Sequence, residues 1–339
     1  MPLCARPAIW ETRFLVMNDQ KMKGEMRFFG FDIGGTKCAV VLGDGEGRVL
    51  KKERFATTTP EETIERLFSI AESMGGALAV GISCGGPLSS ERGVILSPPN
   101  LPGWDEIEIV RRTEERLGIP AYLCNDANAG AIAEWRFGAG KGCKNVIFMT
   151  FGTGLGAGLI LDGKLYAGTN DNAGEAGHVR LAPDGPVGYG KRGSFEGFCS
   201  GAGLAQLGRA AAEQALTEGR KPLFCPDREA LERIDARVLA EAARAGDPTA
   251  CAVFCSCGEK LGRGCAMLVD LFNPERIVIG SIFARCEDLL REPMERVMHE
   301  EALPGALEVC RVVPAALGES IGDVAALSVA VDGWSRREN

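Results

Sequence analysis

The sequence lacks three features, and each absence excludes a class of protein. No run of apolar residues reaches the roughly eighteen needed for a membrane helix. Basic residues are not in excess, since 38 Lys and Arg stand against 46 Asp and Glu for a net charge of −8. This acidity argues against a polyanionic partner such as DNA. No Gly-X-Y period accompanies the 45 glycines, which excludes collagen. A small-molecule function is therefore the expectation.

The first 27 residues also lack the apolar core and small-residue cleavage site of a secretion signal. We predict that residues 1–27 are a disordered extension, or that translation starts later, because Met17, Met22 and Met26 follow the first methionine. A regular pattern begins only at Phe28.

The thirteen cysteines are odd in number and scattered, which is typical of reduced core residues in a cytoplasmic protein. Cys251, Cys255 and Cys257 lie close together, with Cys265 further on. We interpret them as small core side chains on one helix. A metal site is disfavoured because no neighbouring His or second ligand pair completes a tetrahedron.

Glycine is nearly twice as frequent as the usual level of about 7%, with 45 in 339 residues. Two glycine-containing segments, Phe28–Leu50 and Val146–Gly168, share one plan of strand, glycine turn, strand, tight reversal and strand. Gly34 aligns with Gly152 in this repeat. The repeat predicts a duplicated α/β domain with a ligand-binding cleft between its halves.

The first glycine turn runs from Asp32 to Lys37 and joins two strands, so it is neither a P-loop nor a Rossmann fingerprint. Its glycines allow backbone N–H groups to face an anion, and Asp32 can face a magnesium ion through water. A plain tight hairpin would explain the glycines but not the polar residues around them. The second turn, Gly152–Gly156, has the same composition, so together the two turns favour binding of a polyphosphate.

A third feature lies in Ala121–Ala129, where an apolar strand ends at Asn125 and Asp126 and a helix begins that runs to about Phe137. Asp126 is a candidate helix cap, but capping does not account for the whole Asn-Asp-Ala-Asn cluster. Apolar periodicity and chain punctuation predict further helices over Pro60–Ser73, Asp105–Leu117, Ala202–Ala215, Asp227–Ala245, Ala250–Leu268 and Ile321–Val331.

Five motifs in this order, Asp32–Lys37, Asn100–Trp104, Asn125–Ala129, Gly152–Gly156 and Gly174–His178, resemble those of the ROK family of sugar kinases and related repressors. The resemblance extends from about Phe28 to Gly333. It implies an α/β fold of duplicated actin-like ATPase, ribonuclease H-like domains with a central cleft. The N-terminal domain would comprise residues 28–138 plus 320–334, and the C-terminal domain residues 139–319.

The resemblance also implies an activity, namely ATP-dependent phosphorylation of a hexose hydroxyl, the 6-hydroxyl of glucose or a close relative, with Asp126 as general base. ATP and Mg²⁺ would be required, with Asp32 holding the magnesium through water. The implied sugar-binding residues are Asn100, Asn125, Asp126, Glu175, His178 and Glu196. The implied nucleotide-binding residues are Asp32, Gly34, Gly35, Thr36, Lys37, Gly152, Thr153, Gly154 and Gly280.

The sequence departs from the family at its zinc site, which the His of the Gly-His pair and three cysteines after it usually form. The three cysteine positions are Val187, Tyr189 and Ser194 here. We therefore expect no zinc, and we expect apolar packing of Val187 and Tyr189 to hold the loop. His178, without a metal, is left either to bind the sugar or to satisfy a neighbouring carbonyl.

Three alternatives are weighed against a hexose kinase. An N-acetylmannosamine kinase, or another aminosugar kinase, is barely distinguishable by sequence. A repressor would need a basic DNA-binding segment, which an acidic chain with 27 residues before Phe28 does not suggest. A non-catalytic sugar-sensing ROK protein is disfavoured because Asp126 and the glycine turns are intact. We expect a cytoplasmic homodimer without nucleic-acid or membrane partners, supported by an apolar helix face over Ala250–Leu268.

Overall fold

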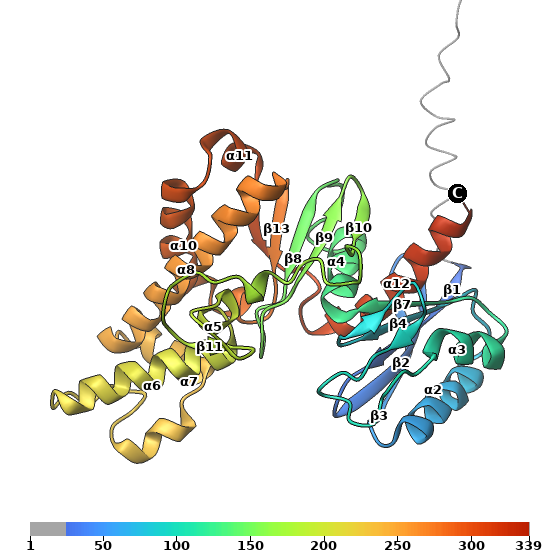
Figure 1. The fold of residues 1–339 in the computed structure, drawn as a ribbon, viewed down its shortest axis with the longest axis horizontal. Helices are drawn as coiled ribbons and strands as arrows, with labels where there is room; N and C mark the ends of the chain where they lie inside the picture. Colours follow the sequence, from blue (N-terminus) through green and yellow to red (C-terminus); the bar gives the residue numbers. More distant parts are fainter. Residues whose placement is uncertain (1–24, 339) are drawn as a thin grey trace, which may run out of the picture. The chain divides into compact units, whose positions relative to one another are not determined.

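The computed structural model describes residues 25–338 of the chain (Figure 1). The predicted N-terminal extension falls, apart from its last three residues, outside the described residues. The chain forms two compact units. Unit 1 comprises residues up to Ala133 and from Ser320 onward, and unit 2 comprises Glu134–Glu319. The division falls inside helix α4 (Asp126–Phe137), a few residues before the predicted domain boundary at Gly138.

Unit 1 is a five-stranded sheet in the order β3-β2-β1-β4-β7. Its strands are β1 (Arg27–Ile33), β2 (Lys37–Asp44), β3 (Val49–Ala56), β4 (Val80–Cys84) and β7 (Ala121–Asn125). The first three strands are antiparallel, and β4 and β7 run parallel to β1. Helices α2 (Pro60–Met74) and α3 (Ile109–Leu117) cover one face, while α12 (Ile321–Glu338) covers the other (Figure 1). A small hairpin is formed by β5 (Leu88–Ser89) and β6 (Val94–Ile95).

Unit 2 repeats this plan in a sheet of order β10-β9-β8-β13-β14. Its strands are β8 (Val146–Met149), β9 (Ala157–Leu161), β10 (Lys164–Tyr166), β13 (Arg276–Ile279) and β14 (Arg311–Pro314). Three antiparallel strands are again followed by two parallel ones. The two sheets therefore share strand order and direction, as the sequence repeat predicts.

The remaining elements of unit 2 are mostly helices, packed around the long helix α8 (Pro248–Phe272). They are η1 (Ala176–His178), α5 (Phe195–Phe198), α6 (Gly201–Thr217), η2 (Arg228–Arg233), α7 (Ala236–Arg244), α9 (Ile282–Arg285), α10 (Glu287–Glu301) and α11 (Pro304–Val309). Strands β11 (Val187–Gly188) and β12 (Lys191–Arg192) form a short hairpin, and η3 (Gly318–Ser320) leads into α12.

Two predicted helices differ from the structure. The helix predicted over Asp105–Leu117 begins only at Ile109. The helix predicted over Asp227–Ala245 is two elements, η2 and α7, because Asp235 caps a new helix by accepting a hydrogen bond from the Val238 N–H at 2.8 Å. The second error arises because Asp235 suits a cap as well as a helix interior.

The interpretation of the α8 cysteines as core residues is partly wrong. Cys257 and Cys265 are buried, but Cys251 and Cys255 are exposed. The apolar face of α8 is buried in the core of unit 2 with residues of α7 and α10. That face is therefore already covered within unit 2 and is not free to bind a second copy of the chain. The homodimer stays a prediction that no longer has this face as support.

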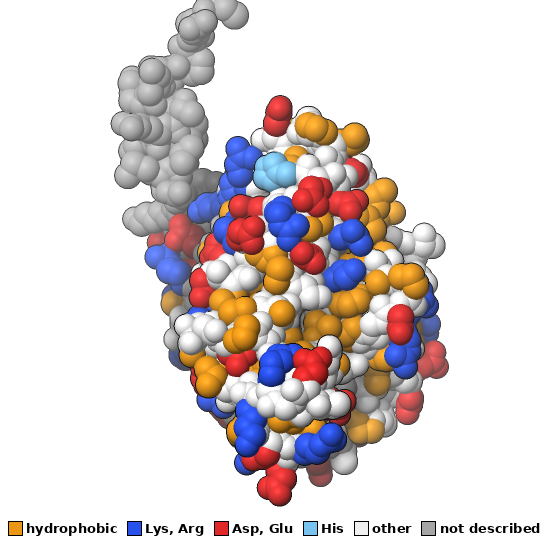
Figure 2. Space-filling view, turned by 90° about the vertical axis from the view of Figure 1, so that its left-hand side faces the viewer, with side chains coloured by type: hydrophobic (Ala, Val, Ile, Leu, Met, Phe, Trp, Pro, Cys, Tyr) orange, Lys and Arg blue, Asp and Glu red, His pale blue; other side chains and the backbone are white. Residues whose placement is uncertain are grey.

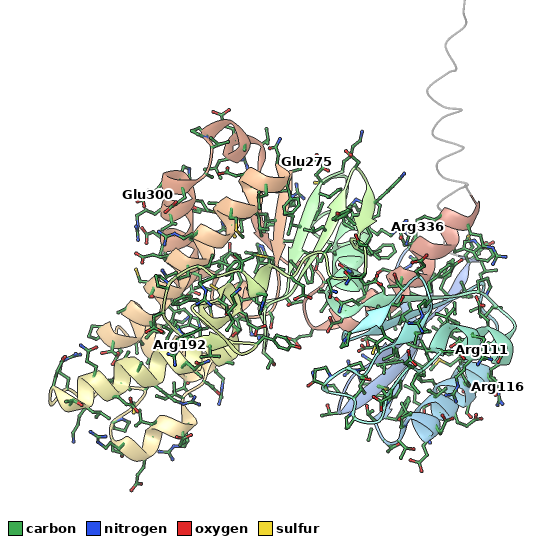
Figure 3. The ribbon with its side chains drawn as sticks, in the orientation of Figure 1. Arg111, Arg116, Arg192, Glu275, Glu300 and Arg336 are labelled. Atoms are coloured by element: carbon green, nitrogen blue, oxygen red, sulfur yellow. The ribbon has the colours of Figure 1, made fainter. Side chains whose placement is uncertain are left out.

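Surface charges in both units are arranged as ion pairs. Arg116 of α3 joins Glu72 and Glu65 of α2, and Arg111 pairs along its own helix (Figure 3). On the face of unit 2 that carries α10, acidic and basic side chains alternate rather than gather into one basic patch (Figure 2). Exposed pairs of this kind contribute at most about 1 kcal/mol each.

Within residues 25–338, no helix is both long enough and apolar enough to cross a membrane.

Helix α12 packs on β1 and β4 through glycine. A Cβ atom on Gly81 would lie 2.1 Å from the Ala326 carbonyl oxygen and 2.4 Å from the Ala330 nitrogen. Gly30 of β1 has the same relation to Leu327. The helix backbone therefore lies directly on the sheet, with no side chain between them.

We expect Gly81→Ala to lower the free energy of unfolding by about 1–3 kcal/mol, because the added methyl group must push α12 away. The control is Gly76→Ala, since a Cβ atom there meets nothing within 4 Å, and it should change stability by less than about 0.5 kcal/mol. Urea unfolding of both variants measures the difference. Equal stability of the two would contradict the packing described here.

Candidate active site

Polar residues collect at the carboxyl edge of the unit 1 sheet, where β1, β4 and β7 end side by side. Asp32 pairs in register with Ser83, and Cys84 pairs with Asn125. Burial raises the pKa of Asp32 to about 6, and the carboxylates of Asp323 and Asp126 add to this rise. The nearby cations Arg54 and Lys52 oppose it. Two neighbouring carboxylates thus act on Asp32 at this edge.

The first glycine turn is held tightly against a second loop. The Gly34 N–H donates to the Lys37 carbonyl at 3.2 Å, and the Thr57 hydroxyl donates to the Gly34 carbonyl at 2.6 Å. A Cβ atom on Gly35 would lie 2.3 Å from the carbonyl oxygen of Asn100. The structure therefore brings Asn100 to the turn, while the side chains of Thr36 and Lys37 are exposed.

Asp126 begins α4 directly after β7. The Ala127 N–H donates to Asn125 Oδ1 at 3.0 Å and to Asp126 Oδ1 at 2.8 Å, so the carboxylate does take part in capping. Asp126 is nevertheless exposed. The surrounding protein displaces part of its water, which raises its pKa, while hydrogen bonds from backbone N–H groups lower it. An exposed carboxylate with an elevated pKa is suited to accept a proton.

Sequence reasoning missed the charges behind this edge. Asp323 of α12 is 6% exposed and pairs with Lys52 of β3, 271 residues away in the sequence. Asp323 Oδ1 also lies 3.7 Å from Arg54 Nη2. A Cβ atom on Gly322 would be 3.2 Å from Asp32 Oδ2, so the start of α12 touches the site. In the sequence, Asp323 stands out only as an acidic residue in the first turn of a predicted helix.

The second glycine turn lies in unit 2 and is bonded to Glu196. The Leu155 N–H donates to Glu196 Oε2 at 3.0 Å. A Cβ atom on Gly154 would lie 2.7 Å from the same oxygen. The Gly201 N–H donates to the Gly152 carbonyl at 2.8 Å, which ties the start of α6 to the turn. The Thr153 side chain is exposed at its tip.

A cavity of about 730 Å³ opens beside this turn, between α6, α7 and α9. Its lining includes Thr153, Ala202, Glu241, Ser281 and Arg285, and its volume lies in the range of small-molecule sites. Gly280, the predicted nucleotide contact, is buried just before the lining residue Ser281. Ser281 has the backbone angles φ 56° and ψ −110°, which are strained for a residue with a side chain. The sequence did not predict that Ser281 and residues of α7 line this cavity.

The predicted sugar-binding residues of unit 2 lie in segments that contact the second turn. Glu175 precedes η1 and His178 is its last residue, and both are exposed. A Cβ atom on Gly177 would lie 2.0 Å from the Leu155 carbonyl oxygen and 3.3 Å from Glu196 Cβ. The structure therefore brings Glu175, His178 and Glu196 together around the turn.

The expectation that apolar packing holds the zinc-site loop is wrong. Val187 is 38% exposed and Tyr189 is 80% exposed. Hydrogen bonds hold the loop instead. The Val187 N–H donates to Gln206 Oε1 and Gln206 Nε2 donates to the Val187 carbonyl, both at 2.9 Å. The buried Ser194 hydroxyl accepts from the Gly197 N–H at 3.1 Å. Within residues 25–338, no group of three His, Cys, Asp or Glu side chains is placed to hold a metal.

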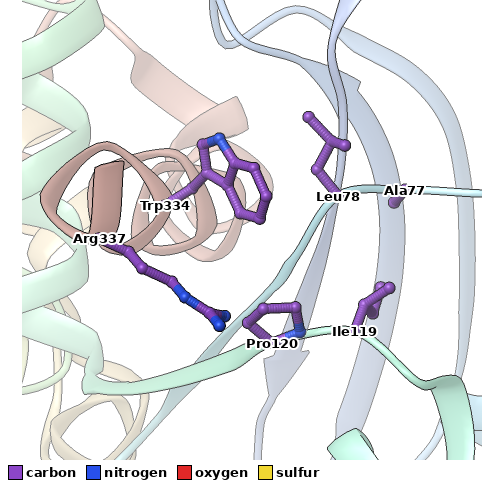
Figure 4. A pocket seen from close by; sticks show the side chains of 6 residues that line it. All are labelled: Ala77, Leu78, Ile119, Pro120, Trp334 and Arg337. Carbon is purple, nitrogen blue, oxygen red and sulfur yellow. The ribbon is translucent and has the colours of Figure 1, made fainter. Parts of the chain in front are cut away.

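A further cavity, of about 530 Å³, lies at the amino edge of the unit 1 sheet. Trp334 and Arg337 of α12 face Leu78 and Pro120 across it (Figure 4). Its lining has one charged side chain and no carboxylate. It therefore offers no group for acid–base chemistry and lies at the opposite edge from Asp126.

Comparison with known proteins identifies the family. The ROK family profile matches residues 28–332. A glucokinase of Streptomyces coelicolor is 34% identical over 310 residues, which cover 89% of this chain and 96% of that protein. A ROK glucokinase structure from Streptomyces griseus, in complex with glucose and AMPPNP, is 34% identical with a TM-score of 0.72, covering 91% of this chain and all of that one. A putative xylose repressor of Caldicellulosiruptor is 30% identical over 285 residues, covering 80% of this chain and 70% of the repressor.

The fold is that of the actin-like ATPases, as predicted. The chain belongs to the ROK family, and within it to the sugar kinases. The predictions of fold class, family and enzyme class are confirmed.

The raised pKa of Asp32 has a consequence for stability. Between its ordinary pKa of 3.8 and about 6, the folded protein binds a proton at Asp32 that the unfolded chain does not. Stability from this group is fully present below pH 3.8 and is lost as the pH rises through 6. Above that pH the ionised carboxylate costs at most about 3 kcal/mol.

We therefore expect Asp32→Asn to increase thermal stability at pH 8 without added Mg²⁺, and the increase should vanish near pH 4. Glu91→Gln, which removes an exposed carboxylate, serves as the control and should show no such pH dependence. Calorimetry at pH 4, 6 and 8 measures the effect. A destabilised Asp32→Asn protein at pH 8 would show that the carboxylate is needed in its ionised form for folding.

Proposed function

We propose that this kinase transfers the γ-phosphoryl group of ATP to a hydroxyl of a hexose, the 6-hydroxyl of glucose or a close relative. The observation that carries the proposal is the exposed Asp126 carboxylate, at the edge where Asn125 and Asp32 also lie. The 34% identity to glucokinases of two Streptomyces species, one in complex with glucose and AMPPNP, supports glucose as the substrate.

The reaction needs a base for the attacking hydroxyl, and Asp126 takes this role. Its carboxylate accepts the hydroxyl proton while the sugar oxygen bonds to the γ-phosphorus. The bond from that phosphorus to the β,γ-bridging oxygen breaks, and ADP leaves with the electron pair. The raised pKa of Asp126 brings its basicity closer to neutral pH, which favours proton transfer.

Sugar hydroxyls are hydrogen-bonded by the remaining polar side chains. We assign this role to Asn100 and Asn125 in unit 1, and to Glu175, His178 and Glu196 in unit 2. Each offers a donor or acceptor for a hydroxyl, and a pocket of such groups discriminates strongly against analogues that lack the hydroxyl. The Glu196 carboxylate accepts from the Leu155 N–H through Oε2, and this bond fixes its orientation. Its other oxygen is assigned to the sugar.

The glycine turns are assigned to the phosphates. Their backbone N–H groups are suited to phosphate oxygens, with Thr36, Lys37 and Thr153 exposed beside them. The residues assigned to the nucleotide are Asp32, Gly34, Gly35, Thr36, Lys37, Gly152, Thr153, Gly154 and Gly280.

Asp32 fits a magnesium ion held through water. It is a hard oxygen donor whose pKa is raised by burial and by two neighbouring carboxylates, so a cation placed there would relieve the repulsion between the carboxylates. Bound Mg²⁺ neutralises charge on the phosphates during transfer. For zinc, the hydrogen-bonded loop at Val187 and Ser194 supports our expectation that none is required.

Replacing Asp126 by Asn keeps the shape of the side chain and removes the proton acceptor. We expect kcat to fall by about 10²–10⁴ with little change in the KM for sugar. Coupled ADP release with glucose, mannose, fructose and N-acetylmannosamine measures turnover, and the sugar that wild type uses best identifies the substrate. Near-normal kcat in Asp126→Asn would remove Asp126 from the base role.

The cavity at the second turn is assigned to the nucleoside of ATP. Ala202 is exposed and lines it, whereas Ala210 is exposed on the same helix and does not. Ala202→Trp should fill the cavity and raise the KM for ATP about tenfold without changing the KM for sugar. Ala210→Trp is the matched control, and an unchanged KM for ATP in both variants would place the nucleoside elsewhere.

A further inference from the structure

The hairpin turn between β11 and β12 contains an unusual residue. Its two turn residues, Tyr189 and Gly190, have φ angles of 43° and 74°. A two-residue turn with both φ angles positive favours Asn-Gly, whereas a bulky residue with positive φ is rare and strained. The turn itself therefore gives no reason for a tyrosine at this position.

The packing of unit 2 gives no reason either. The Tyr189 side chain is 80% exposed, so it buries almost no apolar surface in the fold. Its ring meets the imidazole of His178 edge-on, with 6.3 Å between the ring centres. A strained backbone that presents an unburied aromatic ring beside a histidine points to a role in binding.

The groups around this ring are those assigned to the sugar. Glu175 precedes the single turn of η1, His178 ends it, and the Gly177 backbone between them packs on Glu196. Lys191, two residues after Tyr189, donates from Nζ to the His178 carbonyl at 2.7 Å. The hairpin is therefore tied directly to the sugar-binding segment.

The hairpin is also held in place from behind. Gln206 of α6 binds both backbone groups of Val187. A Cβ atom on Gly188 would lie 2.5 Å from the Gly197 nitrogen, so the strand lies flat against α5. The ring of Tyr189 thus projects from a backbone that is held in place, so that no ordering of the loop is needed when a ligand binds.

We propose that Tyr189 is a specificity-determining sugar-binding residue. Its ring packs against the C–H face of the hexose ring and holds the sugar against Glu175, His178 and Glu196. A tyrosine suits this role because the body of its ring is apolar, as a hexose is apolar on its ring face. This inference rests on the proposed function.

The test compares Tyr189→Asn with Tyr189→Phe in the full-length enzyme, using the sugar that wild type phosphorylates best. Asn suits the turn better than Tyr, so the melting temperature of Tyr189→Asn should be equal or higher. Its KM for sugar should rise about tenfold, with kcat and the KM for ATP within about threefold of wild type. Tyr189→Phe keeps the ring and should retain a KM within about twofold. Calorimetric titration with the sugar alone should show the same order of affinities.

A wild-type KM for sugar in a stably folded Tyr189→Asn enzyme would overturn the inference, and so would an equal loss in Tyr189→Phe. Tyr189→Gly is a second variant without the ring, and glycine adopts the turn angles freely. Its KM for sugar should match that of Tyr189→Asn. If wild type phosphorylates no sugar, the proposed function fails and this inference fails with it. If wild type is active and the variants match it, only the inference about Tyr189 fails.

Discussion

The site in unit 1 depends on the direct packing of helix α12 against the glycines of β1 and β4. Gly30 and Gly81 leave no room for a side chain, so the helix backbone rests on the sheet. That contact fixes the distance between α12 and the sheet, and with it the position of the first turn of α12. Gly322 therefore reaches Asp32, and Asp323 reaches Lys52. The last segment of the chain in this way sets the charge around the first glycine turn.

The negative charge of Asp32 lowers the stability of the fold but serves the proposed reaction. Asp32 is buried at a sheet edge beside the carboxylates of Asp323 and Asp126, and its pKa is raised by the burial first and by their repulsion second. Lys52 and Arg54 relieve only part of the repulsion, because they face Asp323. A protein that needed only stability would have a neutral residue at position 32. The proposed binding of a phosphate-bound cation and the proposed proton transfer both need negative charge there, which is the usual conflict between stability and activity.

How far the sequence predicts this protein depends on whether the signal is local. Glycine turns between apolar strands are local, and so is the strand-to-helix junction at Asp126, so both sheets and the candidate base could be predicted. The contact of Asp323 with Lys52 joins residues 271 positions apart, and only the topology brings them together. Tyr189 was misjudged for another reason. Apolar character predicts burial on average, but it does not distinguish a side chain that packs from one that binds.

The central claim is that this chain phosphorylates a sugar. The most direct measurement is ³¹P NMR of the protein incubated with ATP, Mg²⁺ and one sugar at a time. We expect a sugar phosphate resonance that grows in step with ADP, for glucose or a close relative, and no ADP formation without sugar. Sugar binding detected by calorimetry, with no phosphorylated product from any hexose or N-acetylhexosamine, would contradict the account and leave a sugar-binding protein without kinase activity.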